Sequence, residues 1–148
     1  MTLDRSEYVR ANEESRARLR TLVERLDHTQ LAQSPMPGWS VSALLAHLAF
    51  WDRFNVHRWR SRLAGTQLPA LDVLDDLIND SALPAWNALP PEVAARDALA
   101  SAEEGDAFVA GLTAEITARW LEEGRPRSLF RSEHRREHLD DIERALAH

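Results

Sequence analysis

Hydrophobic residues recur every three to four positions along almost the whole chain, which is the spacing of one face of an α-helix. No segment alternates hydrophobic and polar residues as a half-buried strand does, and β-branched residues are sparse. The pattern therefore predicts an all-α protein. Its first helix is expected over residues 4–26, with a stripe formed by Tyr8, Ala11, Ser15, Leu19, Leu22 and Leu26.

Proline and glycine divide this pattern into separate helices. The sequence SPMPGW at 34–39 holds two prolines and a glycine, and Ser40 after it is a suitable N-cap because its hydroxyl can accept a free N–H of the first turn. We expect a second helix over residues 41–63. A third helical segment is expected over residues 71–88, bent or interrupted near Pro84, because proline lacks the N–H that an interior position needs.

The rest of the chain continues in the same way. A fourth helix begins with Pro91 in its first turn, and a short helix over 113–122 and a loop over 122–128 follow it. The last helix is expected over residues 132–147. Four long helices with short extra ones predict a four-helix bundle that forms a single domain over residues 1–148. The long connections between the second and fourth helices leave room for a crossover instead of a simple up-and-down order.

Composition narrows the class of protein. A chain of 148 residues is long enough for one buried core. No hydrophobic run approaches the roughly 18 residues of a membrane span, and the first residues are charged, so we expect a cytoplasmic protein that does not bind a membrane. The absence of cysteine and lysine excludes disulfides, thiolate metal ligands, cysteine nucleophiles and lysine catalysis.

The charge distribution argues against a nucleic-acid partner. The net charge is −6, and the phosphate backbone attracts basic proteins. Arginine is concentrated in RWRSR at 58–62 and in HRREH at 134–138. Both sequences lie within helical patterns, so we expect their arginines on solvent-exposed helix faces.

The histidines of HRREH have the spacing of a metal site. His134 and His138 are four residues apart, so on a helix they share one face, with Cβ atoms about 5–6 Å apart. Helical His-x-x-x-His sites use this spacing, because two ligands one turn apart can reach the same ion. Taken alone, the pair is also typical of surface histidines in a charged helix.

His47 changes the interpretation of that pair. It lies among hydrophobic residues such as Leu48 and Trp51 on the second helix, where a single histidine is usually a hydrogen-bonded core residue. If the bundle brings it to His134 and His138, the three imidazoles form a three-ligand site with open positions. That pattern is typical of a catalytic ion, because structural ions are usually closed by four protein ligands.

The remaining histidines fit a metal role less well. His57 lies ten residues after His47, about 80° around the helix, and is expected to be exposed. His28 lies in a connection, and His148 is the last residue of the chain. We expect no metal role for these three.

Two segments resemble the DinB/YfiT superfamily of metal-binding four-helix bundles. They are PGWSVSALLAHLAFWD, at the start of the second helix, and HRREHLDDI, on the last one. In that family, a histidine of the second helix and a His-x-x-x-His pair on the final helix bind a divalent ion, usually zinc or nickel. These ligands match His47, His134 and His138. The segments DDLIND and LPPEVAARDAL are similar to the branch related to the maleylpyruvate isomerase N-terminal domain and the thiol-dependent S-transferases.

The resemblance implies a fold and an activity. The fold is an up-down-down-up bundle, often a homodimer. The best understood activity in the family is either the transfer of a low-molecular-weight bacterial thiol, such as mycothiol or bacillithiol, or an isomerisation that uses such a thiol. An ion held by three neutral imidazoles would favour the thiolate form of a bound thiol, which would attack an electrophilic small molecule. Two alternatives stay open: a metal-dependent hydrolase acting through bound water, and a non-catalytic metal-binding stress protein.

Other side chains are candidates for the surroundings of the ion. Trp51, one turn after His47, is expected to line the ligand pocket. Arg58 is placed to bind an anionic substrate tail, with a surface ion pair as the alternative. Three acidic residues lie close in sequence to the histidines: Asp52, Glu133 and Glu137. Each either accepts a hydrogen bond from an imidazole N–H or, as we expect, is an exposed charge on its helix. Further aromatic residues that either line the pocket or, as we expect, belong to the core are Trp39, Phe54, Trp59 and Trp86.

Overall fold

A computed structural model describes residues 4–68 and 74–147, and every regular element within them is helical. This confirms the all-α class. Among the described helices, none combines the length and the hydrophobicity that crossing a bilayer requires. The long helices are α1 (Arg5–Arg25), α3 (Val41–Leu63), α5 (Pro91–Ala110) and α7 (Arg131–Leu146). The shorter elements are α2 (His28–Leu31), α4 (Asp75–Ala88), α6 (Ala114–Glu122) and the 3-10 turn η1 (Pro126–Ser128).

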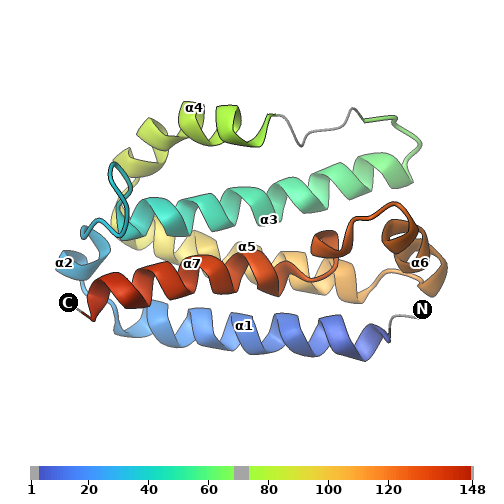
Figure 1. Cartoon of the computed structure of the whole chain (residues 1–148), viewed down its shortest axis with the longest axis horizontal. Coiled ribbons are helices and arrows are strands. Elements are labelled where there is room, and N and C mark those ends of the chain that lie inside the picture. The colour runs from blue at the N-terminus through green and yellow to red at the C-terminus, as the bar shows by residue number, and fades with distance from the viewer. Residues whose placement is uncertain (1–3, 69–73, 148) are drawn as a thin grey trace.

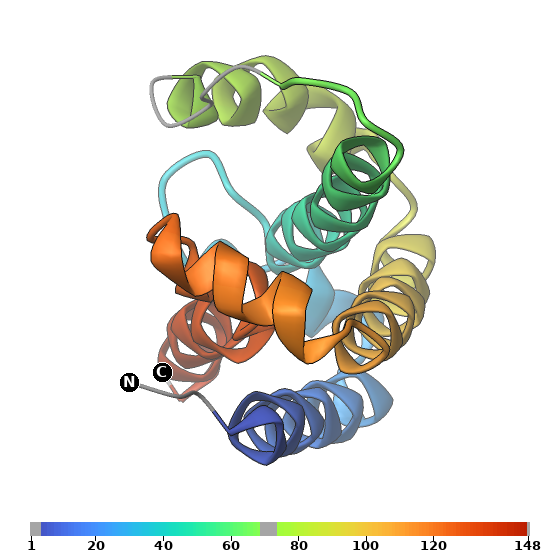
Figure 2. The ribbon, with the colours of Figure 1, turned by 90° about the vertical axis from the view of Figure 1, so that its right-hand side faces the viewer.

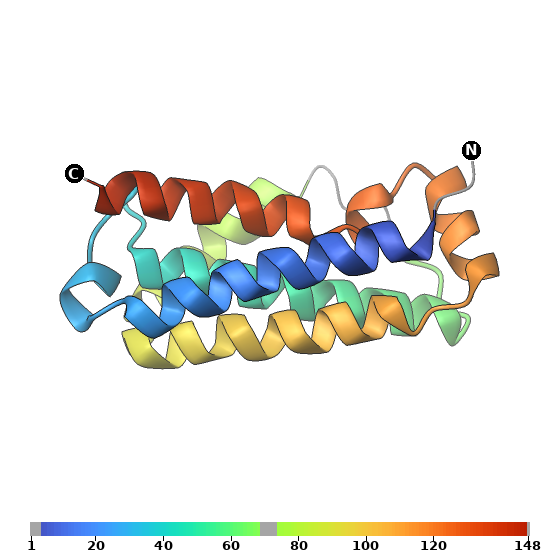
Figure 3. The same ribbon diagram turned by 90° about the horizontal axis from the view of Figure 1, so that it is seen from below.

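The four long helices lie side by side, and the short elements are attached around them. Figure 1 shows α1 and α7 running towards one end of the molecule, and α3 and α5 running towards the other. Helix α4 lies outside α3 and provides the crossover between the parallel pair α3 and α5. Helix α6 crosses the end of the long helices (Figure 2), and from below α1 is seen between α5 and α7 (Figure 3).

The helix boundaries largely agree with the sequence pattern. Helix α3 runs from Val41 to Leu63 as predicted, and the backbone N–H of Ala43 donates to the hydroxyl of its N-cap Ser40 at 3.0 Å. The segment around His28, predicted as a connection, forms the one-turn helix α2. A capping box between Asp27 and Gln30 stabilises the N-terminus of this helix.

A bend or an interruption was predicted near Pro84, and the interruption is wrong, because helix α4 continues through this residue. Pro84 cannot donate to the carbonyl four residues before it, which belongs to Asp80. Asp80 is exposed, so water can satisfy that carbonyl without breaking the helix. Residues 71–73, which the sequence pattern assigned to the start of this helix, lie outside the described residues.

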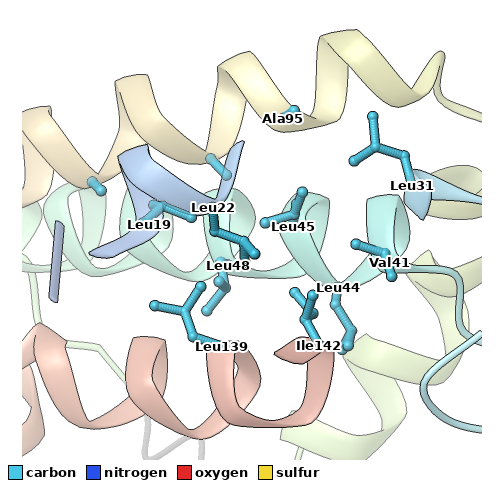
Figure 4. Packing of buried hydrophobic residues seen from close by; sticks show 12 residues of the cluster. Leu19, Leu22, Leu31, Val41, Leu44, Leu45, Leu48, Ala95, Leu139 and Ile142 are labelled. Carbon is cyan, nitrogen blue, oxygen red and sulfur yellow. The ribbon is translucent and has the colours of Figure 1, made fainter. Parts of the chain in front are cut away.

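The largest hydrophobic cluster joins the four long helices. It contains Leu19 and Leu22 of the predicted first stripe, both almost fully buried, and it contacts α7 through Leu139 and Ile142 (Figure 4). Each fully buried leucine contributes about 1.5–3 kcal/mol relative to an exposed one. The cluster therefore holds α3 and α7 together next to the histidines of these two helices.

A second hydrophobic cluster closes the opposite end of the molecule. Trp59 of α3 stacks on Trp120 of α6, and both are buried. Tyr8, Val109 and Leu129 complete it. This cluster explains why α6 and η1 fold back over the ends of α1 and α3 before α7 begins.

Candidate metal centre

The structure brings together the three histidines that the sequence pattern singled out. His47 comes from α3, and His134 and His138 come from α7. Each offers one ligand nitrogen, and these atoms all lie within 4.8 Å of one another. The Nε2 atoms of His47 and His134 are 2.9 Å apart, and each of the three pairs of ring centroids is separated by 4.8–4.9 Å. Such a set of imidazole nitrogen donors suits zinc and nickel.

Local packing fixes the imidazole of His47. It is 5% exposed and lies edge-on to the rings of Trp39 and Trp86, with centroids at 5.4 and 5.3 Å. Its Nδ1 is buried and has no hydrogen-bond partner among the described residues. The nitrogen that faces His134 is the other one, Nε2, so Nε2 is the atom that His47 offers to an ion.

Two of the three histidines, His47 and His134, are held in the neutral form that binds metals. Burial, and to a smaller extent the nearby His138, lowers the pKa of His47 to about 3. Burial also places the pKa of His134 well below its ordinary value, with a smaller contribution from the charge of Arg131. Both imidazoles are therefore neutral near pH 7, and a metal ion does not have to displace a proton from them.

The three histidines line a cavity of about 440 Å³. Trp39 and Trp51 form part of its wall, and its charged and polar lining comes from Asp75, Asp76, Asn79, Arg127, Arg131 and Glu137. This volume lies within the usual range of small-molecule sites. An ion on the histidines would thus have ligand positions open towards a cavity, as a catalytic ion requires.

Trp51 lines this cavity, as expected from its place one turn after His47. Its indole N–H donates to Asn79 Oδ1 at 2.8 Å, which ties α4 to α3 at the edge of the cavity. Trp39 was expected in the core but also lines the cavity. It lies in the turn before α3, where helical periodicity gives no information about direction. Trp59 and Trp86 are buried, as predicted.

Arg58 lies in an adjoining cavity of about 180 Å³. This second cavity shares Trp51, Asp75, Arg127 and Arg131 with the histidine cavity. The guanidinium carbon of Arg58 is 6.0 Å from the centroid of the Trp59 ring. Binding of a substrate anion by Arg58 stays a prediction.

The acidic residues predicted near the ion divide into two groups. Glu133 and Glu137 are 50% and 60% exposed and lie 3.4 Å from Arg127. Asp52, in contrast, is 4% exposed and binds Arg131 at 2.9 Å, so its interpretation as an exposed charge is wrong. It accepts hydrogen bonds from arginines instead of an imidazole, because its side chain points into the centre of the bundle.

Arg135 is the other charged residue whose environment differs from the prediction. It is 1% exposed, whereas Arg136, beside it in HRREH, is exposed as expected. Successive helical residues differ by about 100° in direction, so neighbouring arginines face different surroundings. Arg135 faces Asp52 and Asp106, which compensate its charge.

The two other histidines among the described residues, His28 and His57, take no part in the cluster. His28 and His57 are exposed, as expected for His57, and His28 pairs with Glu92 at 2.8 Å. His148 lies outside the described residues.

Asp141 is a partner of the site that the sequence pattern missed. Its Oδ2 lies 3.3 Å from Nδ1 of His138, one turn away on the same helix. A carboxylate in this place fixes the orientation and tautomer of a ligand imidazole. The i, i+3 spacing of His138 and Asp141 in HLDD is the signal that indicates it.

Asp141→Asn should therefore weaken metal binding by about 10–100-fold, the usual cost of losing an outer partner of a ligand histidine. Competition of the purified protein with a coloured chelator would measure this. Asp140→Asn is the matched control, because Asp140 precedes it, is 58% exposed and pairs with Arg18. Equal metal affinity of the two variants would exclude this role for Asp141.

Comparison with known proteins finds a similarity that covers most of the chain. A family model described as the mycothiol maleylpyruvate isomerase N-terminal domain matches residues 13–143, which include all three. No curated protein and no solved structure matches the chain. The match covers the four long helices except for the first residues of α1 and the last residues of α7.

Proposed function

Because the chain belongs to the mycothiol maleylpyruvate isomerase N-terminal domain family, a DinB-like helical family, we propose that it is a metal-dependent S-transferase. It would join a low-molecular-weight thiol to an electrophilic small molecule. The observation that carries this proposal is the histidine cluster at the wall of a cavity. Among the thiols, the family description favours mycothiol, and bacillithiol is the alternative.

The residues of the chain have separate tasks in this reaction. His47, His134 and His138 would hold a divalent ion, such as zinc or nickel, whose Lewis acidity lowers the pKa of a bound thiol. The chain has neither cysteine nor lysine to supply a nucleophile, and in the proposed reaction the nucleophile is the sulfur of the cosubstrate. Trp39 and Trp51 cover one side of the cavity and keep water away from that sulfur. The charged side of the cavity binds polar groups of the two substrates.

Atoms balance in a simple substitution catalysed in this way. The sulfur–hydrogen bond of the thiol breaks, and its proton passes to solvent. A sulfur–carbon bond forms to the electrophile, and the leaving group departs with its electron pair. Neither an oxidant nor a reductant is needed.

The direct test is conjugation of mycothiol to monochlorobimane, which becomes fluorescent when sulfur displaces chloride. We expect turnover by the zinc- or nickel-loaded protein, none after chelation, and recovery when the metal is restored. Bacillithiol and glutathione in parallel reactions would identify the preferred thiol.

The same assay distinguishes the competing functions. Turnover of the electrophile without any thiol would contradict the transferase and favour a hydrolase that uses metal-bound water. Stoichiometric metal binding with no turnover in either reaction would favour a non-catalytic metal-binding protein.

A further inference from the structure

A buried network of charged side chains lies beside the ligand histidines of α7. Its cations, Arg131 and Arg135, precede His134 and His138 by three residues, so they occupy a neighbouring face of the helix about 60° away. The carboxylate that joins them is Asp52 of α3. It accepts from Nε of Arg131 at 2.9 Å and from Nη2 of Arg135 at 3.4 Å. Arg131, Arg135 and Asp52 are at most 8% exposed.

The network also reaches the other two long helices. Nη1 of Arg135 donates to the hydroxyl of Ser15 on α1 at 2.8 Å, and its Nη2 donates to Asp106 on α5 at 3.0 Å. Asn12 of α1 accepts from the backbone N–H of Ser132 at 2.9 Å. It thereby caps the first turn of α7, whose own N-cap residue makes no side-chain hydrogen bond. The other three long helices are thus all bonded to the first half of α7.

The three candidate ligands meet only if α3 and α7 are correctly aligned. Helix α7 packs mainly on α1, and its contact with α3 is smaller. A shift of one residue along α7 would move a ligand by about 1.5 Å and turn it by about 100°. On one side of the histidines, the two helices meet through the hydrophobic cluster that contains Leu44 and Leu139 (Figure 4). On the other side, they meet through Asp52.

We propose that Asp52 is a positioning residue of the metal site. By binding Arg131 and Arg135, it holds α7 in the rotation and register at which His134 and His138 meet His47. The inference rests on the metal site of the proposed function, and it is independent of the thiol reaction. A carboxylate that merely stabilised the fold would not influence the geometry of a bound ion in the folded protein.

The test is a titration of the full-length Asp52→Asn variant with Co²⁺, whose visible absorption reports the coordination geometry. Asparagine keeps the size of the side chain but removes its charge, which weakens both bonds to arginine. We expect about 10-fold weaker Co²⁺ binding and a changed visible spectrum, in a protein whose far-ultraviolet circular dichroism is still helical. Wild-type affinity and an unchanged spectrum would overturn the proposal.

Asp97→Asn is the matched control. Asp97 of α5 also binds an arginine of α3, Arg53, at 3.1 Å, but it is 39% exposed, and neither residue belongs to α7. It should bind Co²⁺ as the wild type does. If Asp52→Asn does not fold, Arg131→Lys decides, because lysine keeps the charge but lacks the Nε–H that donates to Asp52 at 2.9 Å. Weaker Co²⁺ binding with a changed spectrum supports the proposal, and wild-type values overturn it.

The outcomes separate this inference from the proposed function. A wild-type protein that binds no Co²⁺ would overturn both. A wild-type protein that binds Co²⁺ but transfers no thiol would overturn the transferase alone, and the Asp52→Asn comparison would still decide the role of Asp52.

Discussion

His47→Ala should purify with far less divalent metal than the wild type. Among the described residues, His47 is the one candidate ligand from α3, and without it an ion would keep only His134 and His138, which lie one turn apart on α7. Losing a residue that hydrogen-bonds to a ligand histidine weakens metal binding by at most roughly 100-fold. The loss of affinity in His47→Ala should be larger, because a direct bond to the ion disappears. Metal analysis after gel filtration, together with chelator competition, would measure it.

His57→Ala is the control for this experiment. It removes an imidazole from the same helix, and His57 is exposed and not part of the cluster. It should retain the wild-type metal content. Metal-dependent conjugation should also disappear in His47→Ala. Unchanged metal content in this variant would contradict the three-histidine site.

The sequence pattern predicted the histidine cluster because each candidate ligand lies on a long helix that the hydrophobic spacing indicates. Ser40 and the break before it define the start of α3, so the position of His47 on its hydrophobic side followed from periodicity. The pair on α7 followed from its four-residue spacing. Only the meeting of the two helices required knowledge of the tertiary structure, and the family resemblance supplied that expectation.

Periodicity failed where the direction of a side chain depends on distant partners. Trp39 lies in a turn, and its place at the cavity follows from packing against His47 and Trp86. Asp52 and Arg135 are polar residues that a hydrophobic pattern assigns to the surface. They are buried because each is compensated by the other and by charges from helices far away in the sequence. A single sequence contains no signal for such a pairing.

Arg135→Met should destabilise the metal-free protein by about 3–5 kcal/mol, the usual cost of removing one member of a buried ionic group. Methionine is hydrophobic and fills part of the space, so the loss reflects mainly the unpaired charges. Asp106 would keep only Arg16, which is 26% exposed, and Asp52 would keep only Arg131. Urea unfolding followed by circular dichroism, with all proteins stripped of metal, would measure the free energy of unfolding.

Arg136→Met is the matched control, because Arg136 has the same chemistry one residue later but is exposed, and its effect should lie within about 0.5 kcal/mol. The double variant of Arg135→Met with Asp106→Asn should lose less stability than the sum of the two single variants, since removing the anion as well relieves the unpaired charge. Strict additivity would assign the loss to packing instead. An equal, small effect of Arg135→Met and Arg136→Met would contradict the buried network itself, and with it the mechanism by which Asp52 is proposed to orient α7.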